Sequence, residues 1–346
     1  MIQQAIESYI DGRPMEFDKI TAIVDEIMSG KAAQSQVGSF LTALRIRGET
    51  PGEIAAFASI IKRMGFHINP KIDGKLLDTC GTGGDPFKTI NVSTIAALVA
   101  SGAGVRIAKH GGRAVSSKCG SADLLERFGF NMMMKPDDVR HSIEKIGIGF
   151  MFAPAFYPMM KQVAGIRKEL GFRTIFNLLG PLMNPANADA QLIGVSSPEL
   201  TSIMAAAAKE LGIKEALIVY GMGGLDEITL GRTKYSWLQD AKVTEGEFIP
   251  NDFGLRSAPL EELAVQNQEE AVRIAARILR GALKKGPKLD IVLINSAAAI
   301  RLAGLAQDLR EATEIAKESI QSGKALEKLK LLVRYSGGDE AKIETF

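Results

Sequence analysis

From residue 76 onward, short apolar runs alternate with segments of helical periodicity, and this alternation most constrains what the chain can fold into. The expected strands cover 76–79, 105–108, 148–152, 191–195 and 216–220. Strands separated by helices pair in parallel and are covered by helices on both faces. A hairpin of 233–238 with 242–248 is expected at the end of the series. We therefore predict, for residues 73–346, a large α/β domain with a central, mostly parallel sheet flanked by helices.

Residues 1–72 show helical periodicity only, and they predict a small all-helical N-terminal domain. The fourth helix is expected to begin at Thr50-Pro51-Gly52-Glu53, a capping box with proline at the first helical position, and to stop at Gly65. Four short helices make a thin core, so their spare apolar faces require a partner. We expect a helical insert near 160–182 to pack on this domain, and a second copy to complete a homodimer.

Composition and charge disfavour several function classes. The 346 residues carry a formal net charge of only +2, which provides no broad field for nucleic acid or an anionic membrane. The best apolar run, 291–306, is too short and too interrupted to span a bilayer. No signal peptide is evident at the start, and Cys80 and Cys119 suit reduced thiols. These features predict a cytoplasmic protein that binds neither nucleic acid nor membrane.

A glycine-rich loop follows the first expected strand and suggests a phosphorylated sugar as ligand. Gly81, Gly83 and Gly84 fall within four positions, Asp85 ends the loop, and 91–94 (Asn-Val-Ser-Thr) heads the next helix. Such glycines let backbone N–H groups approach phosphate oxygens, and a helix N-terminus favours the same anion. The aspartate suits a sugar diol. A glycine turn without a ligand is the alternative, as is plain helix capping for Asn91.

The segment 109–121 crowds cations, hydroxyls and glycines into what we expect to be a loop after strand 105–108. The interleaved glycines and serines favour anion binding over an ordinary solvated charge run. His110 is one of three histidines. A single histidine is more often a hydrogen-bonding or packing residue than an acid or base, and both interpretations stay open for His110.

Two further features carry chemistry. Asp226 and Glu227 follow the strand 216–220 and suit Mg²⁺, which favours one or two carboxylates together with substrate oxygens. An exposed acidic pair is the alternative. Arg167 lies in an apolar setting, where a guanidinium can bind a carboxylate bidentately. An ordinary ion pair with Glu169 or with another carboxylate is the alternative for Arg167.

Taken together, these motifs resemble the anthranilate phosphoribosyltransferase family, the tryptophan-pathway members of the nucleoside phosphorylase/phosphoribosyltransferase superfamily. The matching segments, which stand in the family's order along nearly the whole chain, are 81–85, 91–94, 109–111, 116–123, 173–182 and 226–227. The resemblance implies a small helical domain, a large α/β domain and a dimer formed through the helices. It implies transfer of phosphoribose from 5-phosphoribosyl 1-diphosphate to the amino group of anthranilate, with release of diphosphate.

The resemblance also implies roles for individual residues. The donor is expected to contact Gly81, Gly84, Asp85, Thr89, Asn91, Val92, Ser93, Thr94, Lys109, His110, Gly111, Gly112, Arg113, Ala114, Val115, Ser116, Ser117 and Ser121. Anthranilate is expected to contact Gly81, His110, Gly112, Arg167 and Pro181. Mg²⁺, as two ions, is expected on Ser93, Asp226 and Glu227. No residue is expected to act as a nucleophile, and Lys109 with Mg²⁺ stabilises the leaving diphosphate.

One position departs from the family pattern. Where the family loop reads Lys-His-Gly-Asn-Arg, this chain has Gly112 in place of the asparagine that contacts anthranilate. Losing one neutral hydrogen bond typically costs about 0.5–1.5 kcal/mol, which weakens binding without abolishing it. A different aromatic acceptor is therefore an alternative. A nucleoside phosphorylase and a non-catalytic relative that binds nucleic acid are two further alternatives, which the acidic pair and the low net charge disfavour.

Overall fold

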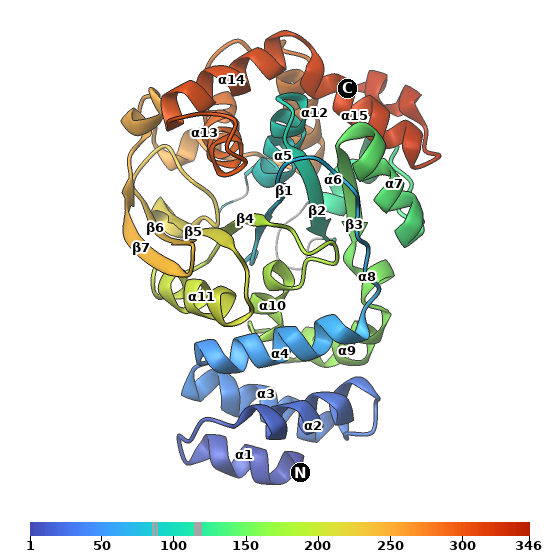
Figure 1. The fold of residues 1–346 in the computed structure, drawn as a ribbon, viewed down its shortest axis with the longest axis vertical. Coiled ribbons are helices and arrows are strands. Elements are labelled where there is room, and N and C mark those ends of the chain that lie inside the picture. Colours follow the sequence, from blue (N-terminus) through green and yellow to red (C-terminus); the bar gives the residue numbers. More distant parts are fainter. Residues whose placement is uncertain (85–86, 88, 114–119) are drawn as a thin grey trace.

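A single twisted sheet forms the centre of the molecule. The computed structural model describes residues 1–84, 87, 89–113 and 120–346, and in these residues seven strands pair in the order β3-β2-β1-β4-β5-β6-β7 (Figure 1). The strands are β1 (Leu76–Gly81), β2 (Arg106–Gly111), β3 (Ile148–Phe152), β4 (Ala190–Gly194), β5 (Glu215–Gly221), β6 (Thr233–Gln239) and β7 (Lys242–Phe248). The strands β3, β2, β1, β4 and β5 run parallel, while β6 and β7 form an antiparallel hairpin. The mostly parallel sheet expected from the sequence is confirmed.

Helices cover both faces of this sheet. One face carries α5 (Val92–Gly102), α12 (Gln268–Leu279), α13 (Pro287–Leu302), α14 (Leu309–Gln321) and α15 (Lys324–Tyr335), of which α5 packs on the other four. The other face carries α10 (Phe176–Leu182) on β2 and α11 (Glu199–Glu210) on β5 to β7 (Figure 1). The helices α6 (Ser121–Arg127), α7 (Pro136–Ile146) and α8 (Ala153–Phe156) lie along the β2–β3 edge. Apolar strands buried on both sides account for the near-continuous hydrophobic runs in the sequence.

The N-terminal segment contains α1 (Ile2–Ile10), α2 (Phe17–Met28), α3 (Gln34–Arg47) and α4 (Pro51–Met64). Thr50 Oγ1 accepts from Glu53 N–H at 3.3 Å, and the Glu53 carboxylate accepts from Thr50 N–H at 3.0 Å, which is the capping box expected there. The insert α9 (Lys161–Leu170) lies against α2 and α3, and α10 lies between α4 and the sheet (Figure 1). The N-terminal helices therefore reach the sheet through α10 and through α11, which also contacts α4.

The strand β2 is longer than expected, and this corrects one interpretation. The sequence suggested that Lys109, His110 and Gly111 belong to a loop, but β2 continues through Gly111 and pairs Lys109 with Phe150 and His110 with Met151 of β3. Pairing with β3 decides this, because local propensity does not favour a strand through Lys-His-Gly. Successive strand residues point to opposite faces of a sheet, so Lys109 faces α5 whereas His110 faces α10.

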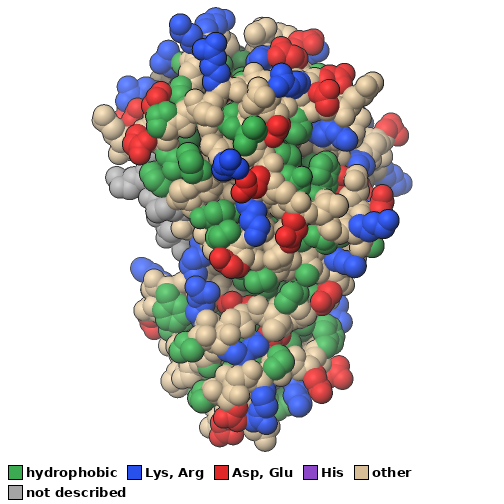
Figure 2. Space-filling model, turned by 90° about the vertical axis from the view of Figure 1, so that its left-hand side faces the viewer, with side chains coloured by type: hydrophobic (Ala, Val, Ile, Leu, Met, Phe, Trp, Pro, Cys, Tyr) green, Lys and Arg blue, Asp and Glu red, His purple; other side chains and the backbone are tan. Residues whose placement is uncertain are grey.

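Surface and membrane features agree with the low net charge. On the face drawn in Figure 2, acidic and basic side chains are intermixed and do not gather into one patch. Within the described ranges, no helix combines the length and hydrophobicity that crossing a bilayer requires. Cys80 is a free thiol, while Cys119 lies outside the described residues.

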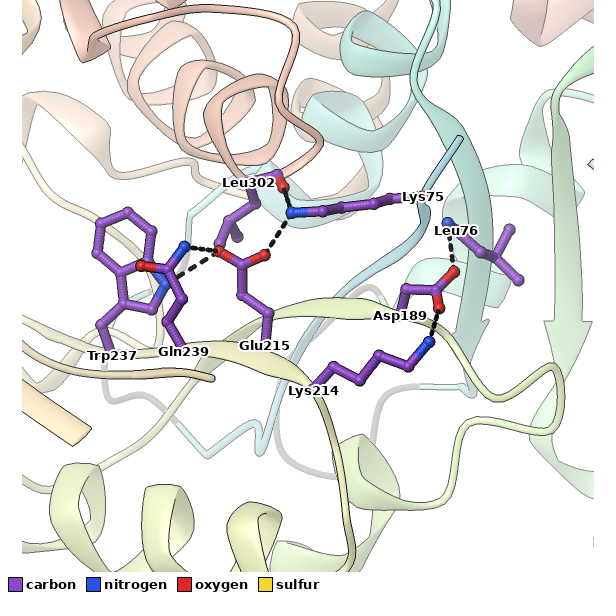
Figure 3. Close-up of polar contacts among 8 residues, drawn as sticks. All are labelled: Lys75, Leu76, Asp189, Lys214, Glu215, Trp237, Gln239 and Leu302. Carbon is purple, nitrogen blue, oxygen red and sulfur yellow. Dashed lines mark hydrogen bonds and ion pairs between the residues drawn. The ribbon is translucent and has the colours of Figure 1, made fainter. Parts of the chain in front are cut away.

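A buried carboxylate ties together the edge of the sheet where the parallel strands begin. Glu215, at the start of β5, accepts from Lys75 Nζ at 2.6 Å, from Gln239 Nε2 at 3.2 Å and from Trp237 Nε1 at 3.3 Å (Figure 3). Lys75 Nζ also donates to the Leu302 carbonyl at the end of α13, at 3.2 Å. One side chain thus joins β5, β6, the start of β1 and, through Lys75, α13.

We expect Glu215→Ala to lower the free energy of unfolding by about 1–3 kcal/mol, because it leaves the Trp237 and Gln239 donors without their acceptor. Glu215→Gln keeps an acceptor oxygen, and the half-exposed Lys75 contributes little by charge, so this variant should lose less than about 1 kcal/mol. Urea unfolding of both variants beside the unmodified protein measures the difference. Equal losses in the two variants would assign the effect to charge instead of hydrogen bonding.

Candidate active site

A cavity of about 340 Å³ opens at the carboxyl ends of β1, β2 and β5. In parallel α/β sheets ligands bind at this edge. Its lining includes fourteen residues expected from the sequence, namely Gly81, Thr89, Asn91, Ser93, Lys109, His110, Gly111, Gly112, Arg113, Ser121, Arg167, Pro181, Asp226 and Glu227. Gly84, Val92 and Thr94 are described but do not line it. Asp85, Ala114, Val115, Ser116 and Ser117 lie outside the described residues.

Further lining residues had no individual contact assigned from the sequence. Thr82, Gly83, Gly120, Phe176, Asn177 and Gly180 lie inside the motif segments, whereas the residues that sequence reasoning missed are Cys80, Phe87, Ile90, Ala153, Val265, Asn267, Gln268 and Ala271. The last four come from the start of α12 and the turn before it, far along the chain from the glycine loop, so no local pattern reveals them. The Thr82 hydroxyl is buried and has no hydrogen-bond partner in the described structure, which leaves it available to a ligand.

The glycine loop lies in direct contact with Asp226 of the acidic pair. Gly83 N–H donates to Asp226 Oδ2 at 2.7 Å, and a Cβ on Gly81 would collide with the same oxygen. Only glycine at position 81 lets the loop lie this close to Asp226. Burial raises the pKa of the Asp226 carboxyl, and the Gly83 N–H opposes that shift.

Arg173 fixes the other side of the glycine loop. Its guanidinium donates to the Gly83 carbonyl, and to the Thr82 carbonyl at 3.1 Å. Gly84 has a φ of +85°, and a Cβ there would strike the guanidinium. The loop is therefore held by a carboxylate on its N–H side and by a cation on its carbonyl side.

Lys109 reaches the cavity from the α5 face of β2. Its side chain is buried, with Nζ donating to the Thr79 carbonyl at 2.6 Å and lying 3.5 Å from Ser93 Oγ. Burial lowers the pKa of Lys109, whereas Asp78, Asp226 and Glu227 act in the opposite direction. Lys109 thus places a positive charge beside the Ser93 hydroxyl, within reach of the Asp226 and Glu227 carboxylates.

His110 reaches the cavity from the α10 face of β2 as a hydrogen-bonding group. Its Nδ1 lies 3.2 Å from the Gly180 carbonyl, so Nδ1 carries the proton of the neutral ring. Burial lowers the pKa of His110 to about 4. Near neutral pH the ring is therefore uncharged, which favours the hydrogen-bonding interpretation over acid–base catalysis.

The guanidinium of Arg113 is already paired with carboxylates. It donates to Asp123 at 3.0 Å and to both Glu126 oxygens at 2.7 and 2.8 Å, on α6. Arg113 lines the cavity while its charge is compensated, so it orders the start of α6.

Arg167 supplies charge to a second end of the cavity, the part lined by α9 and α10, while the glycine loop, Lys109 and the acidic pair form the first end. It is half-buried on α9, its guanidinium carbon lies 5.7 Å from the centre of the Phe176 ring, and burial lowers its pKa. Within the described part of the chain it forms no ion pair, so the expected alternative of a bridge to Glu169 is wrong. A permanent cation over an aromatic ring suits an aromatic carboxylate.

The oxygen donors at the first end suit a hard cation. The Asp226 and Glu227 carboxylates and the Ser93 hydroxyl line one cavity, and Gly83 already orients Asp226. Among the described residues no cluster of three or more His, Cys, Asp or Glu side chains forms a closed metal cage. Such a set fits Mg²⁺, which retains water or substrate oxygens, better than zinc.

Comparisons with known proteins agree with this geometry. Residues 73–326 match the a/b domain of a glycosyl transferase family, and residues 3–65 match its helical bundle domain. The anthranilate phosphoribosyltransferase of Acetivibrio thermocellus is 47% identical over 337 residues, 97% of each chain. The relative from Thermus thermophilus, 40% identical, superposes with a TM-score of 0.90 over 96% of this chain and 99% of its own.

A third relative carries ligands. The anthranilate phosphoribosyltransferase of Saccharomyces cerevisiae, in complex with PRPP and Mg, is 31% identical. It superposes with a TM-score of 0.88 over 97% of this chain and 98% of its own. The similarity therefore extends over both the helical and the α/β parts of the fold.

Proposed function

Because this chain belongs to the anthranilate phosphoribosyltransferase family, we propose that it transfers the phosphoribosyl group of 5-phosphoribosyl 1-diphosphate to the amino group of anthranilate. This reaction is a step of tryptophan biosynthesis. The observation that carries the proposal is the cavity with two unlike ends. One end joins the glycine loop, Lys109 and the acidic pair, while the other joins Arg167 and Phe176.

The two ends suit the two halves of the reaction. The bond from C1 of the ribose to the diphosphate oxygen breaks, the anthranilate nitrogen bonds to C1, and the amine gives up a proton. An aromatic amine is a weak nucleophile, so the residues act mainly by aligning the substrates and by stabilising the departing diphosphate. Arg167 would hold the anthranilate carboxylate, and Lys109 would stabilise the negative charge that develops on the departing diphosphate.

We propose that Ser93, Asp226 and Glu227 hold Mg²⁺, as two ions, when the donor is bound. The oxygen-only donor set and the Mg found with PRPP in the yeast relative support this assignment. Bound Mg²⁺ supplies positive charge that neutralises the diphosphate. Within the chain, Gly83 orients Asp226, and Lys109 adds its charge beside Ser93.

The remaining alternatives are not favoured. Relatives 43–47% identical over nearly the whole chain are all named anthranilate phosphoribosyltransferase, which argues against a different acceptor and against a nucleoside phosphorylase. The mixed charge on the face drawn in Figure 2 and the low net charge give no support to a nucleic-acid binder. The homodimer and the cytoplasmic location stay predictions. The exposed Ile10 and Ile46 on α1 and α3, at 72% and 82%, support dimerisation through the helical segment 1–72.

The decisive experiment mixes the protein with the phosphoribosyl donor, Mg²⁺ and anthranilate, and follows the loss of anthranilate fluorescence. We expect fluorescence loss that requires all three components and releases one diphosphate per anthranilate consumed. Turnover that persists without the donor, or no turnover of anthranilate with rapid turnover of another aromatic amine, would overturn the proposed reaction. Sedimentation of the same preparation measures the oligomeric state.

We expect Gly112→Asn to fold normally and to leave the Michaelis constant for anthranilate unchanged or lower it by up to about tenfold, as one regained hydrogen bond allows. The backbone of Gly112 lies outside the left-handed region, and among the residues that the structure describes an added Cβ would meet only Ala153 Cβ, at 3.9 Å. Steady-state kinetics with anthranilate, beside Gly112→Ala as the matched control, measure the change. A larger constant in the asparagine variant alone would mean that this position needs the space and not the amide.

A further inference from the structure

The acceptor end of the cavity is built on the last turn of α10, and this turn leaves the Pro181 carbonyl without a backbone donor among the described residues. The final carbonyls of any helix lack intrahelical partners. For Pro181 the deficit is enforced by sequence, because the residue four positions later is Pro185, which has no N–H to donate. Pro181 lines the cavity, so the position of this peptide affects the shape of the acceptor end.

A side chain of the sheet supplies the missing donor. Gln191, on β4, is only 2% exposed, and its Nε2 donates to the Pro181 carbonyl at 2.6 Å. Gln191 does not line the cavity, as far as the described residues define it. Its side-chain hydrogen bond in the described structure therefore reaches the cavity wall at Pro181.

The chain after α10 has separate attachments. Asn184 Nδ2 donates to Asp78 Oδ2 at 2.7 Å and to the Ala108 carbonyl at 2.8 Å, and Tyr157 Oη donates to the Met183 carbonyl at 2.5 Å. These contacts keep the segment in place if Gln191 is altered. The bond from Gln191 therefore has a local effect, on the peptide that faces the acceptor.

We infer that Gln191 is a positioning residue for the acceptor substrate: by holding the Pro181 carbonyl it keeps the end of α10 where the aromatic ring of the acceptor packs. The inference rests on the proposed function, since it takes anthranilate as the molecule at this end. It concerns acceptor binding alone, because among the described residues the Gln191 side chain donates to Pro181 and not to the glycine loop, Lys109 or the acidic pair.

Gln191→Met tests this, since methionine has similar size and no donor. We expect the Michaelis constant for anthranilate to rise about tenfold, with the constant for the phosphoribosyl donor unchanged. Gln239→Met is the matched control, because Gln239 also donates one side-chain bond from the sheet, to Glu215 at the far edge. The control should change neither constant.

Equal increases of both constants in Gln191→Met, or no increase at all, would overturn the inference. If Gln191→Met fails to fold, Gln191→Leu replaces it, because leucine is also uncharged and likewise has no donor for the Pro181 carbonyl. The Michaelis constant for anthranilate should again rise, while the constant for the phosphoribosyl donor stays unchanged. Wild-type protein in the same assay separates the two hypotheses: no turnover of anthranilate there refutes the proposed function, whereas normal turnover without this difference between the two constants refutes only the role of Gln191.

Discussion

Replacing Glu227 by glutamine should lower turnover by about 100-fold or more while leaving the fold intact, as losing a charge that stabilises a leaving group typically does. Glu227 lines the cavity beside Asp226, which Gly83 orients, and both carboxylates act on buried Lys109. The substitution removes one negative charge without changing size. Initial rates over a range of Mg²⁺ concentrations measure the effect, and we expect more Mg²⁺ to be needed for half-maximal rate.

Glu245→Gln is the control for Glu227→Gln, because Glu245 is an exposed carboxylate on β7 away from the cavity. This control should retain full turnover, and both variants should unfold at the wild-type temperature. Wild-type turnover in Glu227→Gln would contradict the assignment of the acidic pair. Full activity of the unmodified protein in excess chelator would contradict it equally.

Replacing Arg167 by alanine should raise the Michaelis constant for anthranilate by about 10- to 150-fold, the range that corresponds to losing a charged hydrogen bond of about 1.5–3 kcal/mol. The guanidinium is half-buried over Phe176 and has no carboxylate partner in the described structure, so a bound carboxylate would be its counter-charge. The constant for the phosphoribosyl donor should hardly change. Steady-state kinetics with each substrate varied in turn measure both constants.

Lys168→Ala is the matched control for Arg167→Ala, since Lys168 is the next residue of α9 and its side chain is exposed. It removes a nearby positive charge without opening the cavity. Comparable effects of the two variants would indicate a general electrostatic influence of α9. Equal losses for donor and acceptor in Arg167→Ala would place the arginine at the donor end or give it a structural role.

Much of the architecture could be predicted from the sequence because it depends on local patterns. Apolar runs separated by amphipathic segments predicted the parallel strands, and Thr50 with Glu53 predicted the start of α4. The end of β2 could not be predicted in this way. Lys109 and His110 look like loop residues, and only pairing with β3 makes them part of a strand.

The candidate site was predictable where its residues cluster along the chain, and not where tertiary contact brings them together. The glycine loop and the acidic pair have local signatures, whereas the start of α12 reaches the cavity only because α12 packs on α5. Gln191 did leave a signal, a lone amide within the apolar run of β4. The role of this amide becomes clear only in the fold, where Gln191 donates to the Pro181 carbonyl.

The alternation along β2 has a consequence for how the site can be altered. Lys109 and His110 are neighbours in one strand, so their backbone positions differ by the rise of a single residue, about 3.3 Å, while their side chains leave opposite faces of the sheet. A deletion in β2 would exchange the two side chains between faces instead of shortening the gap. Changes meant to widen the acceptor range are therefore better placed outside β2, in α9, in α10 or at Gly112, because they leave Lys109 and His110 on their own faces of the sheet.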